Sequence, residues 1–151
     1  MASFKHPYFN DGASERLYAE YLKHDTLYIA FDFDNTIWNY DIGKSKYTIN
    51  NPNLFHIDII KLLQKCRLYG FKLILWTSCP TEEDIEYKVK ACAARDINPD
   101  YVNYSPLSPN AIKPHFSLLL DDRAGLESAV TILENLFERI ENEKNISNKK
   151  S

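Results

Sequence analysis

Three features that would assign this chain to a specialised class are missing from its sequence. Its three cysteines, Cys66, Cys79 and Cys92, lack the close pairing that zinc sites and disulfide frameworks use. No apolar run approaches the length of a membrane span, and the first residues carry no apolar leader segment. Basic residues are not in excess, since 18 Lys and Arg stand against 21 Asp and Glu. These absences favour a reducing cytoplasm, and they argue against a membrane protein or a strongly basic nucleic-acid binder.

The composition that remains is that of one globular domain. The chain has 151 residues, 44% of them hydrophobic, which suits a single core. We expect one domain over residues 1–143, with a small flap or loop insertion at 35–50. The segment from Glu141 onward is rich in Asn, Lys and Ser, so residues 144–151 are predicted to form a disordered tail.

Short apolar runs alternate along the chain with segments of helical spacing. Strands are predicted at 26–31, 71–76, 100–104 and 116–120, and helices at 13–23, 52–70, 81–98 and 126–140. Asn51-Pro52 is a typical helix start and Gly70 a typical helix stop. This alternation predicts an α/β fold, with a Rossmann-like parallel sheet and helices on both faces.

Polar side chains follow the predicted strands at their carboxyl ends. They are Asp32 and Asp34 after the first strand, Thr77 and Ser78 after the second, and Asp121 and Asp122 after the fourth. The carboxyl ends of parallel strands meet at one edge of a sheet, which is where open α/β sheets bind ligands. Lys113 lies in the loop before the fourth strand and would have to reach across to that edge.

Carboxylates gathered at one edge are unfavourable unless something compensates their charge. Repulsion raises their pKa values or requires a cation. A hard divalent ion with oxygen ligands meets this need, and Mg²⁺ is the usual choice beside phosphate groups. The sequence therefore predicts a magnesium site.

The motifs also resemble those of a known family. Phe31-Asp32-Phe33-Asp34-Asn35-Thr36 resembles the first motif, DxDx[T/V], of the haloacid dehalogenase superfamily of phosphatases. Thr77, with Ser78 as the alternative, resembles the second motif, Lys113 the third, and Asp121-Asp122 the acidic pair of the fourth. All four occur in the family's order, over about residues 26–125.

The resemblance implies an Mg²⁺-dependent phosphohydrolase that cleaves a phosphate monoester through an aspartyl-phosphate on Asp32. By this resemblance, Asp34 would protonate the leaving oxygen and then activate water. Thr77 or Ser78, together with Lys113, would hold the phosphoryl oxygens. Mg²⁺ would be bound by Asp32, by the backbone carbonyl of Asp34 and by Asp121, with Asp122 as a further ligand or as support for one.

The resemblance implies the strand order 3-2-1-4 as well, and the chain leaves no room for the family's large cap domains. A capless site is open to a bulky substrate such as a nucleotide or a nucleic-acid end, or to a partner or second copy that acts as a lid. Asn35 stands where many members carry Gly, which would stiffen the loop after Asp34. Trp38 and Tyr40 in this loop either stack on a ring of the substrate or pack the loop down.

Other interpretations stay open. The chain could be a non-catalytic phosphate- or nucleotide-binding module, or a phospho-accepting regulatory domain like a response-regulator receiver. Receivers, however, place the acidic pair after the first strand and the phosphorylated Asp on a later one, the reverse of the order here. Lys113 could be a plain surface lysine, Asp121-Asp122 a helix cap, and Arg123 the partner of a carboxylate or of the substrate. Hydrolysis and phosphotransfer to another acceptor share the same first step.

Overall fold

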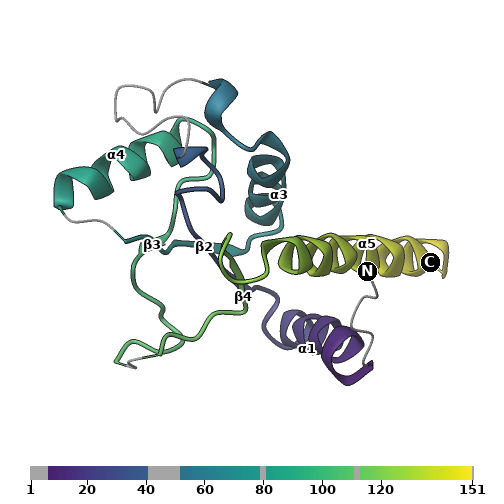
Figure 1. Cartoon of the computed structure of the whole chain (residues 1–151). Helices are drawn as coiled ribbons and strands as arrows, with labels where there is room; N and C mark the ends of the chain where they lie inside the picture. The colour runs from purple at the N-terminus through teal and green to yellow at the C-terminus, as the bar shows by residue number, and fades with distance from the viewer. Residues whose placement is uncertain (1–6, 41–51, 79–80, 111–112, 151) are drawn as a thin grey trace, which may run out of the picture.

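A parallel sheet of four strands forms the centre of the computed structural model, which describes residues 7–40, 52–78, 81–110 and 113–150. The strands are β1 (Tyr28–Phe31), β2 (Lys72–Leu75), β3 (Tyr101–Val102) and β4 (Leu118–Leu120), in the order β3-β2-β1-β4. Helices flank the sheet, namely α1 (Pro7–His24), η2 (Pro52–Leu54), α3 (Ile57–Leu68), α4 (Glu82–Ala93) and α5 (Leu126–Lys150) (Figure 1). The predicted α/β class and strand order are confirmed. No helix in the described part of the chain is long and apolar enough to cross a membrane.

The two middle strands are apolar throughout because both of their faces are covered. Ile29, Ala30 and Phe31 are fully buried in β1, and so are three successive residues of β2, Leu73–Leu75. The register pairs Phe31 of β1 with Leu75 of β2 on one side and with Leu120 of β4 on the other. The residues that follow these three positions therefore leave the sheet side by side.

The two faces of the sheet are covered differently. Side chains alternate along a strand, and Ile29, Phe31, Leu73 and Leu75 belong to the core shared with α3, α4 and α5. On the other face, the connection from β3 to β4 brings Phe116 against Trp76, with ring centroids 5.0 Å apart. In Figure 1, α3 and α4 lie above the strands and this connection lies below them.

The helix predicted to begin at Pro52 begins instead at Ile57, which corrects the expected start. Pro52–Leu54 forms only a short 3-10 turn, and His56 is the N-cap of α3. The cause is a backbone pairing with the loop after β1: the N–H of Asn39 donates to the carbonyl of Leu54 at 2.7 Å, and that of His56 donates to the carbonyl of Ile37 at 2.8 Å. Phe55 forms a bridge with Trp38 and His56 is extended, so the helix cannot run through these two positions.

The predicted stop of this helix is confirmed at Gly70. The Gly70 N–H donates to the carbonyl of Arg67, and the Phe71 N–H donates to that of Cys66, each at 3.0 Å. This pattern is a Schellman cap, which needs a left-handed residue, and Gly70 has a φ of 79°. The sharp turn sends the chain directly into β2.

The outer helices extend further than the sequence indicates. α1 begins at Pro7, before the expected residue 13, and packs along α5, where Arg139 pairs with Glu15 at 2.6 Å. α5 continues to Lys150, through the segment predicted as a disordered tail, and its side chains from 141 to 149 are exposed. Of the expected flap at 35–50, residues 41–50 lie outside the described residues, as does Cys79.

Candidate functional site

Three carboxylates meet where β1 and β4 end. The Asp32 N–H donates to the carbonyl of Leu120 at 2.9 Å, which continues the strand pairing and sets Asp32 beside Asp121. One carboxylate oxygen from each of Asp32, Asp121 and Asp122 lies within 4.8 Å of the other two. The structure therefore brings together three of the four acids that were predicted from the positions of the strand ends, whereas the carboxylate of Asp34 pairs with Lys88.

The pKa of the Asp32 carboxyl reflects its burial and, after that, this crowding. The pKa of its carboxyl is raised from 3.8 to about 7, first by burial and then by the negative charges of Asp121, Asp122 and Asp34. A hydrogen bond from the Phe33 N–H, 2.8 Å long, acts in the opposite direction but does not cancel the rise. Without a cation, the cluster is thus unfavourable in its fully ionised form.

The acids form a set of oxygen donors that suits a hard cation. Carboxylate oxygens are the ligands that Mg²⁺ and Ca²⁺ prefer, and the described cluster contains neither a thiol nor an imidazole. A divalent ion here would also relieve the repulsion that raises the pKa of Asp32. Asp32, Asp121 and Asp122 are therefore the residues that would hold a metal, and they fit Mg²⁺.

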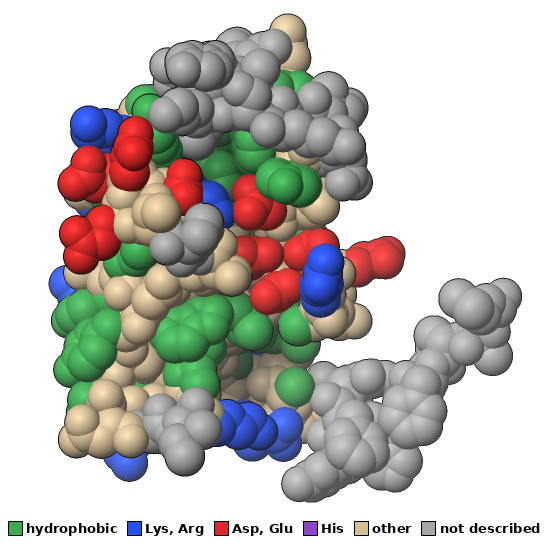
Figure 2. Space-filling view, turned by 60° about the vertical axis from the view of Figure 1, so that its left-hand side comes forward, with side chains coloured by type: hydrophobic (Ala, Val, Ile, Leu, Met, Phe, Trp, Pro, Cys, Tyr) green, Lys and Arg blue, Asp and Glu red, His purple; other side chains and the backbone are tan. Residues whose placement is uncertain are grey.

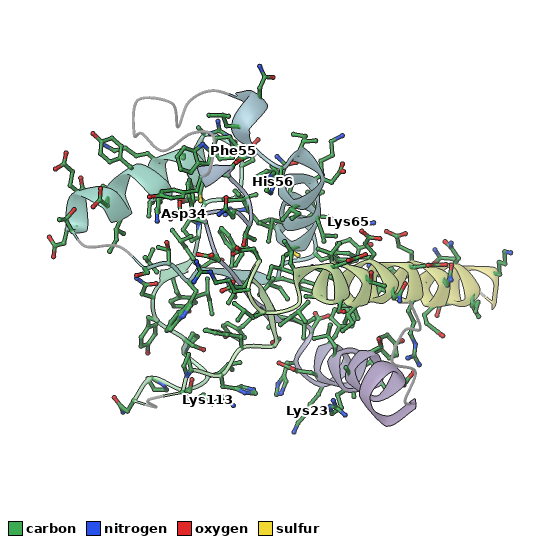
Figure 3. The ribbon with its side chains drawn as sticks, viewed as in Figure 1. Lys23, Asp34, Phe55, His56, Lys65 and Lys113 are labelled. Atoms are coloured by element: carbon green, nitrogen blue, oxygen red, sulfur yellow. The ribbon has the colours of Figure 1, made fainter. Side chains whose placement is uncertain are left out.

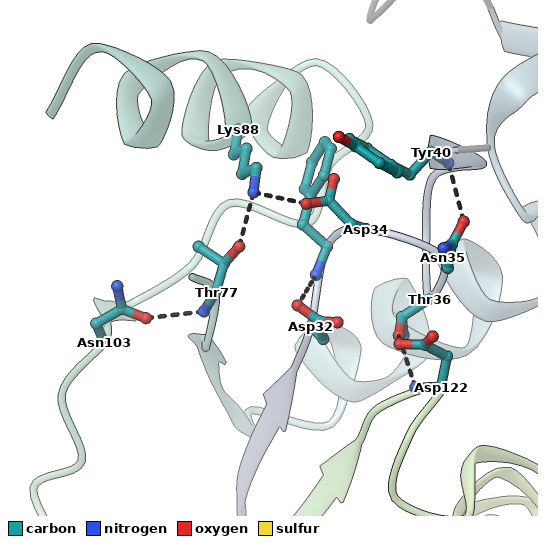
Figure 4. A network of polar contacts seen from close by, with 10 residues as sticks. Asp32, Asp34, Asn35, Thr36, Tyr40, Thr77, Lys88, Asn103 and Asp122 are labelled. Carbon is teal, nitrogen blue, oxygen red and sulfur yellow. Dashed lines mark hydrogen bonds and ion pairs between the residues drawn. The ribbon is translucent and has the colours of Figure 1, made fainter. Parts of the chain in front are cut away.

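Thr36 ties the loop after β1 to the loop after β4. Its hydroxyl oxygen is fully buried and accepts the Asp122 N–H at 3.0 Å, with an Asp122 carboxylate oxygen 3.5 Å away (Figure 4). Asn35 adopts the left-handed conformation that turns the chain, with a φ of 58°, and its side-chain oxygen accepts the Tyr40 N–H. These bonds fix the Asp34 loop against the acidic pair.

A lysine that the sequence analysis missed enters the site from α4. The ammonium of Lys88 donates to the Asp34 carboxylate at 3.1 Å and to the Thr77 hydroxyl at 2.8 Å (Figure 4). The lysine side chain is only 12% exposed, and its Nζ lies 5.4 Å from the centre of the Phe33 ring. Lys88 is thus held between the first and second of the predicted motifs.

The sequence did contain a signal for Lys88. In the helix predicted at 81–98, Ile85 and Cys92 are apolar residues at helical spacing, and Lys88 lies three residues after the first and four before the second. A lysine on the apolar stripe of a helix needs a partner inside the molecule. That partner is the pair formed by Asp34 and Thr77.

Lys113 is not brought to this site. It is exposed in the connection before β4, and Figure 3 places it at the far side of the molecule from Asp34. The reason is the path of the chain, because β4 starts at the amino edge of the sheet, where the Ser117 N–H donates to the carbonyl of Tyr28. The described part of the connection before β4 is also held by its own hydrogen bonds, such as that from the His115 N–H to the Ser108 hydroxyl. The ammonium group of Lys113 therefore lies away from the carboxyl edge of the sheet.

The site opens into a pocket of about 530 Å³. Besides the four aspartates and Thr77, its walls are formed by Asn35, Tyr40, Trp76, Ser78, Asn103 and Arg123. Asn103 follows β3, and its side-chain oxygen accepts the Thr77 N–H at 2.8 Å. All four strands therefore contribute to one concave edge, and Figure 2 shows acidic side chains gathered on this face with a few basic ones among them.

Comparison with known proteins identifies one structural likeness. The chain is similar to the solved structure of a conserved protein from Bacteroides thetaiotaomicron, with a TM-score of 0.53 and 22% sequence identity. The match covers 83% of this chain and 98% of that one. At this identity the likeness shows the fold alone. No family model matches the chain, and no curated protein matches it.

Proposed function

We propose that the chain is an Mg²⁺-dependent phosphohydrolase that cleaves a phosphate monoester through an aspartyl-phosphate on Asp32. The observation that carries the proposal is the position of Asp32 between two kinds of group. Asp121 and Asp122 lie on one side and form a cation site with it, whereas Thr77 and Lys88 lie toward β2 and α4. The resemblance to the haloacid dehalogenase superfamily supports the same assignment.

The reaction follows from these positions. A carboxylate oxygen of Asp32 attacks phosphorus, the bond from phosphorus to the leaving oxygen breaks, and Asp34 supplies the proton that the leaving group takes up. Water then attacks the aspartyl-phosphate with Asp34 as base, which releases inorganic phosphate and restores Asp32. A bound Mg²⁺ would supply charge neutralisation at the phosphoryl oxygens.

Lys88 takes the role that the resemblance assigned to Lys113. Its ammonium already donates to the Thr77 hydroxyl, so the two donors present themselves together to a phosphoryl group near Asp32. When no substrate is bound, the contact with Asp34 keeps Lys88 in place. A phosphoryl group would replace Asp34 as the partner of Lys88, so that Asp34 can enter the reaction in its protonated form. Lys113 is exposed outside the pocket and has no part in the reaction.

The open pocket leaves room for a leaving group larger than an alcohol. A nucleotide or a nucleic-acid end fits the proposal at this level, in a cytoplasmic setting, with a partner or a second copy of the chain able to cover the site. Among the described residues, no separate domain lies over this edge (Figure 1).

The test is release of p-nitrophenol from p-nitrophenyl phosphate by the native protein, with Mg²⁺ and with EDTA. We expect turnover that requires Mg²⁺ and that is lost in Asp32→Asn. Asp58→Asn is the matched control, because it makes the same chemical change at an exposed position on α3. Equal turnover in Asp32→Asn and in the native protein would contradict the proposal.

If the native protein shows no turnover, trapping of BeF₃⁻ separates the remaining functions. Mg²⁺-dependent capture that fails in Asp32→Asn indicates a phospho-accepting domain or an enzyme with a strict substrate. Absence of capture by the native protein indicates a binding module and overturns the proposal.

A further inference from the structure

Arg123 occupies an unusual position at the rim of the pocket. Its backbone N–H donates to a carboxylate oxygen of Asp121 at 2.8 Å, which fixes the residue directly beside the acidic cluster. Its side chain is exposed and lines the pocket. Arg123 is therefore the basic residue nearest in sequence to the acidic pair that follows β4. Because β4 and β2 lie on opposite sides of β1, Arg123 and Thr77 follow strands on opposite sides of Asp32.

The guanidinium of Arg123 has no partner within the described part of the chain. No hydrogen bond or ion pair holds it, although carboxylates are close by. Other arginines are engaged: Arg67 donates to the carbonyl of Asn98, Arg95 to that of Ala91, and Arg139 pairs with Glu15. A guanidinium that is pinned through its backbone and left unpaired in a pocket is suited to an anion that arrives from outside.

The rest of the pocket wall suits a ring and offers a further donor. Tyr40 is 46% exposed, Trp76 is partly exposed, and both line the pocket, so the wall includes aromatic residues. Because the Asn103 side-chain oxygen accepts the Thr77 N–H, its amide NH₂ points the other way (Figure 4). These groups lie outside the set that handles the phosphoryl group, and the volume of about 530 Å³ extends over them.

Resting on the proposed function, we propose that Arg123 binds a second anionic group of the substrate. The substrate is then a small phosphate monoester whose leaving group carries a carboxylate or a second phosphate, with a planar ring between the two anions. A guanidinium binds either anion through paired N–H donors, so the shared chemistry is an anionic group with two or more oxygens. A long polyanion is disfavoured, because the face around the pocket is acidic and the chain carries a net charge of −3.

The experiment compares phosphate esters of similar shape whose leaving groups carry either a charged or a neutral substituent. Phenyl phosphate, 3-carboxyphenyl phosphate and the neutral 3-carbamoylphenyl phosphate are hydrolysed by the native protein with Mg²⁺, and kcat and KM are measured for each. We expect kcat/KM for the carboxyl ester to exceed that for the carbamoyl ester by about tenfold or more, mainly through KM. A nucleoside 3′,5′-bisphosphate against the 5′-monophosphate provides the same comparison for a second phosphate, and a 5′-phosphorylated oligonucleotide tests the polymer.

The preference must depend on Arg123. In Arg123→Gln we expect the ratio of carboxyl to carbamoyl kcat/KM to fall close to one, and in Arg123→Lys to recover in part. Arg139→Gln, which makes the same change on α5 where Arg139 pairs with Glu15, keeps the native ratio.

Failure of this inference is distinguishable from failure of the proposed function. Asp32-dependent turnover of phenyl phosphate with no charge preference, with a preference that survives in Arg123→Gln, or with the oligonucleotide as the best substrate overturns the role of Arg123 alone. Absence of Asp32-dependent turnover for every ester overturns the proposed function, and the role of Arg123 falls with it.

Discussion

At the scale of single residues, Lys88 shows how one side chain serves both the fold and the site. A nearly buried ammonium is costly, and three contacts offset that cost here: the Asp34 carboxylate, the Thr77 hydroxyl and the face of the Phe33 ring. These contacts connect α4 to the ends of β1 and β2. Removal of the charge therefore tests the chemistry and the local structure together.

We expect Lys88→Gln to reduce kcat/KM for p-nitrophenyl phosphate by roughly 100- to 1000-fold, since a positioned donor to the transferred group is lost. Lys113→Gln, the matched change at the exposed lysine, leaves kcat/KM within about twofold. Steady-state kinetics of both variants, with circular dichroism to confirm folding, provides the comparison. A large loss in Lys113→Gln together with a small loss in Lys88→Gln would return the role to Lys113.

At the scale of elements, the loop after β1 and the loop after β4 act as one unit. The Thr36 hydroxyl accepts the Asp122 N–H at 3.0 Å and also lies 3.5 Å from an Asp122 carboxylate oxygen, so one side chain makes both of these contacts between the two loops. Because both loops carry acids of the proposed cation site, their separation would decide how well those acids can share an ion. This linkage can be broken without a change in side-chain volume.

Thr36→Val removes the hydroxyl and keeps the shape. We expect the free energy of unfolding to fall by roughly 1 to 2 kcal/mol, because the Asp122 N–H loses its acceptor, and the Mg²⁺ affinity to fall by about tenfold. Urea denaturation and isothermal titration calorimetry measure the two effects. Thr36→Ser keeps the hydroxyl and should keep most of the Mg²⁺ affinity; equal losses of affinity in the two variants would show that the linkage does not support the site.

The elements also show which parts of the fold the sequence can predict. The strands and the stop at Gly70 depend on apolar runs and on one left-handed residue, and such local signals identified them correctly. The start of α3 depends on a backbone pairing between Ile37–Asn39 and Leu54–His56, which no local pattern reveals, so Pro52 was a misleading signal.

The sequence likewise predicts some residues of the candidate site and misses another. The acids follow strands, so the rule that parallel strands end at a common edge was enough to bring Asp32, Asp121 and Asp122 together. Which lysine reaches the site, Lys88 or Lys113, depends instead on the path of the β3–β4 connection and on the packing of α4. The order of the motifs in the chain favoured Lys113, whereas the fold supplies Lys88.

At the scale of the whole molecule, the acidic cluster makes stability depend on pH and, under the proposed function, on metal. In the metal-free protein the pKa of Asp32 is raised to about 7, mainly by burial, so the folded state binds a proton there that the unfolded state has released. The stabilisation from this proton is fully present below about pH 4 and is lost as the pH rises through about 7.

In EDTA we expect Asp32→Asn to be more stable than the native protein at pH 8 and nearly equal to it at pH 4. Since the carboxyl is only half-buried, solvent screening limits the difference at pH 8 to roughly 1 to 2 kcal/mol. Urea unfolding at both pH values measures it, and added Mg²⁺ should stabilise the native protein more than the variant. Parallel pH profiles for the two proteins would contradict the assignment of the raised pKa to Asp32.

The hydrogen bond between Thr36 and Asp122 also has a consequence in time. Its partners are 86 positions apart in the chain, so at about 5 to 20 residues per second a ribosome adds the second roughly 4 to 17 s after the first. During that interval the Asp32 and Asp34 segment exists without β4, the neighbour that completes both its sheet pairing and its cation site. The proposed cation site is therefore complete only after Asp121 and Asp122 have been added, and β1, β2 and β3 are synthesised before an ion can find its full set of acids.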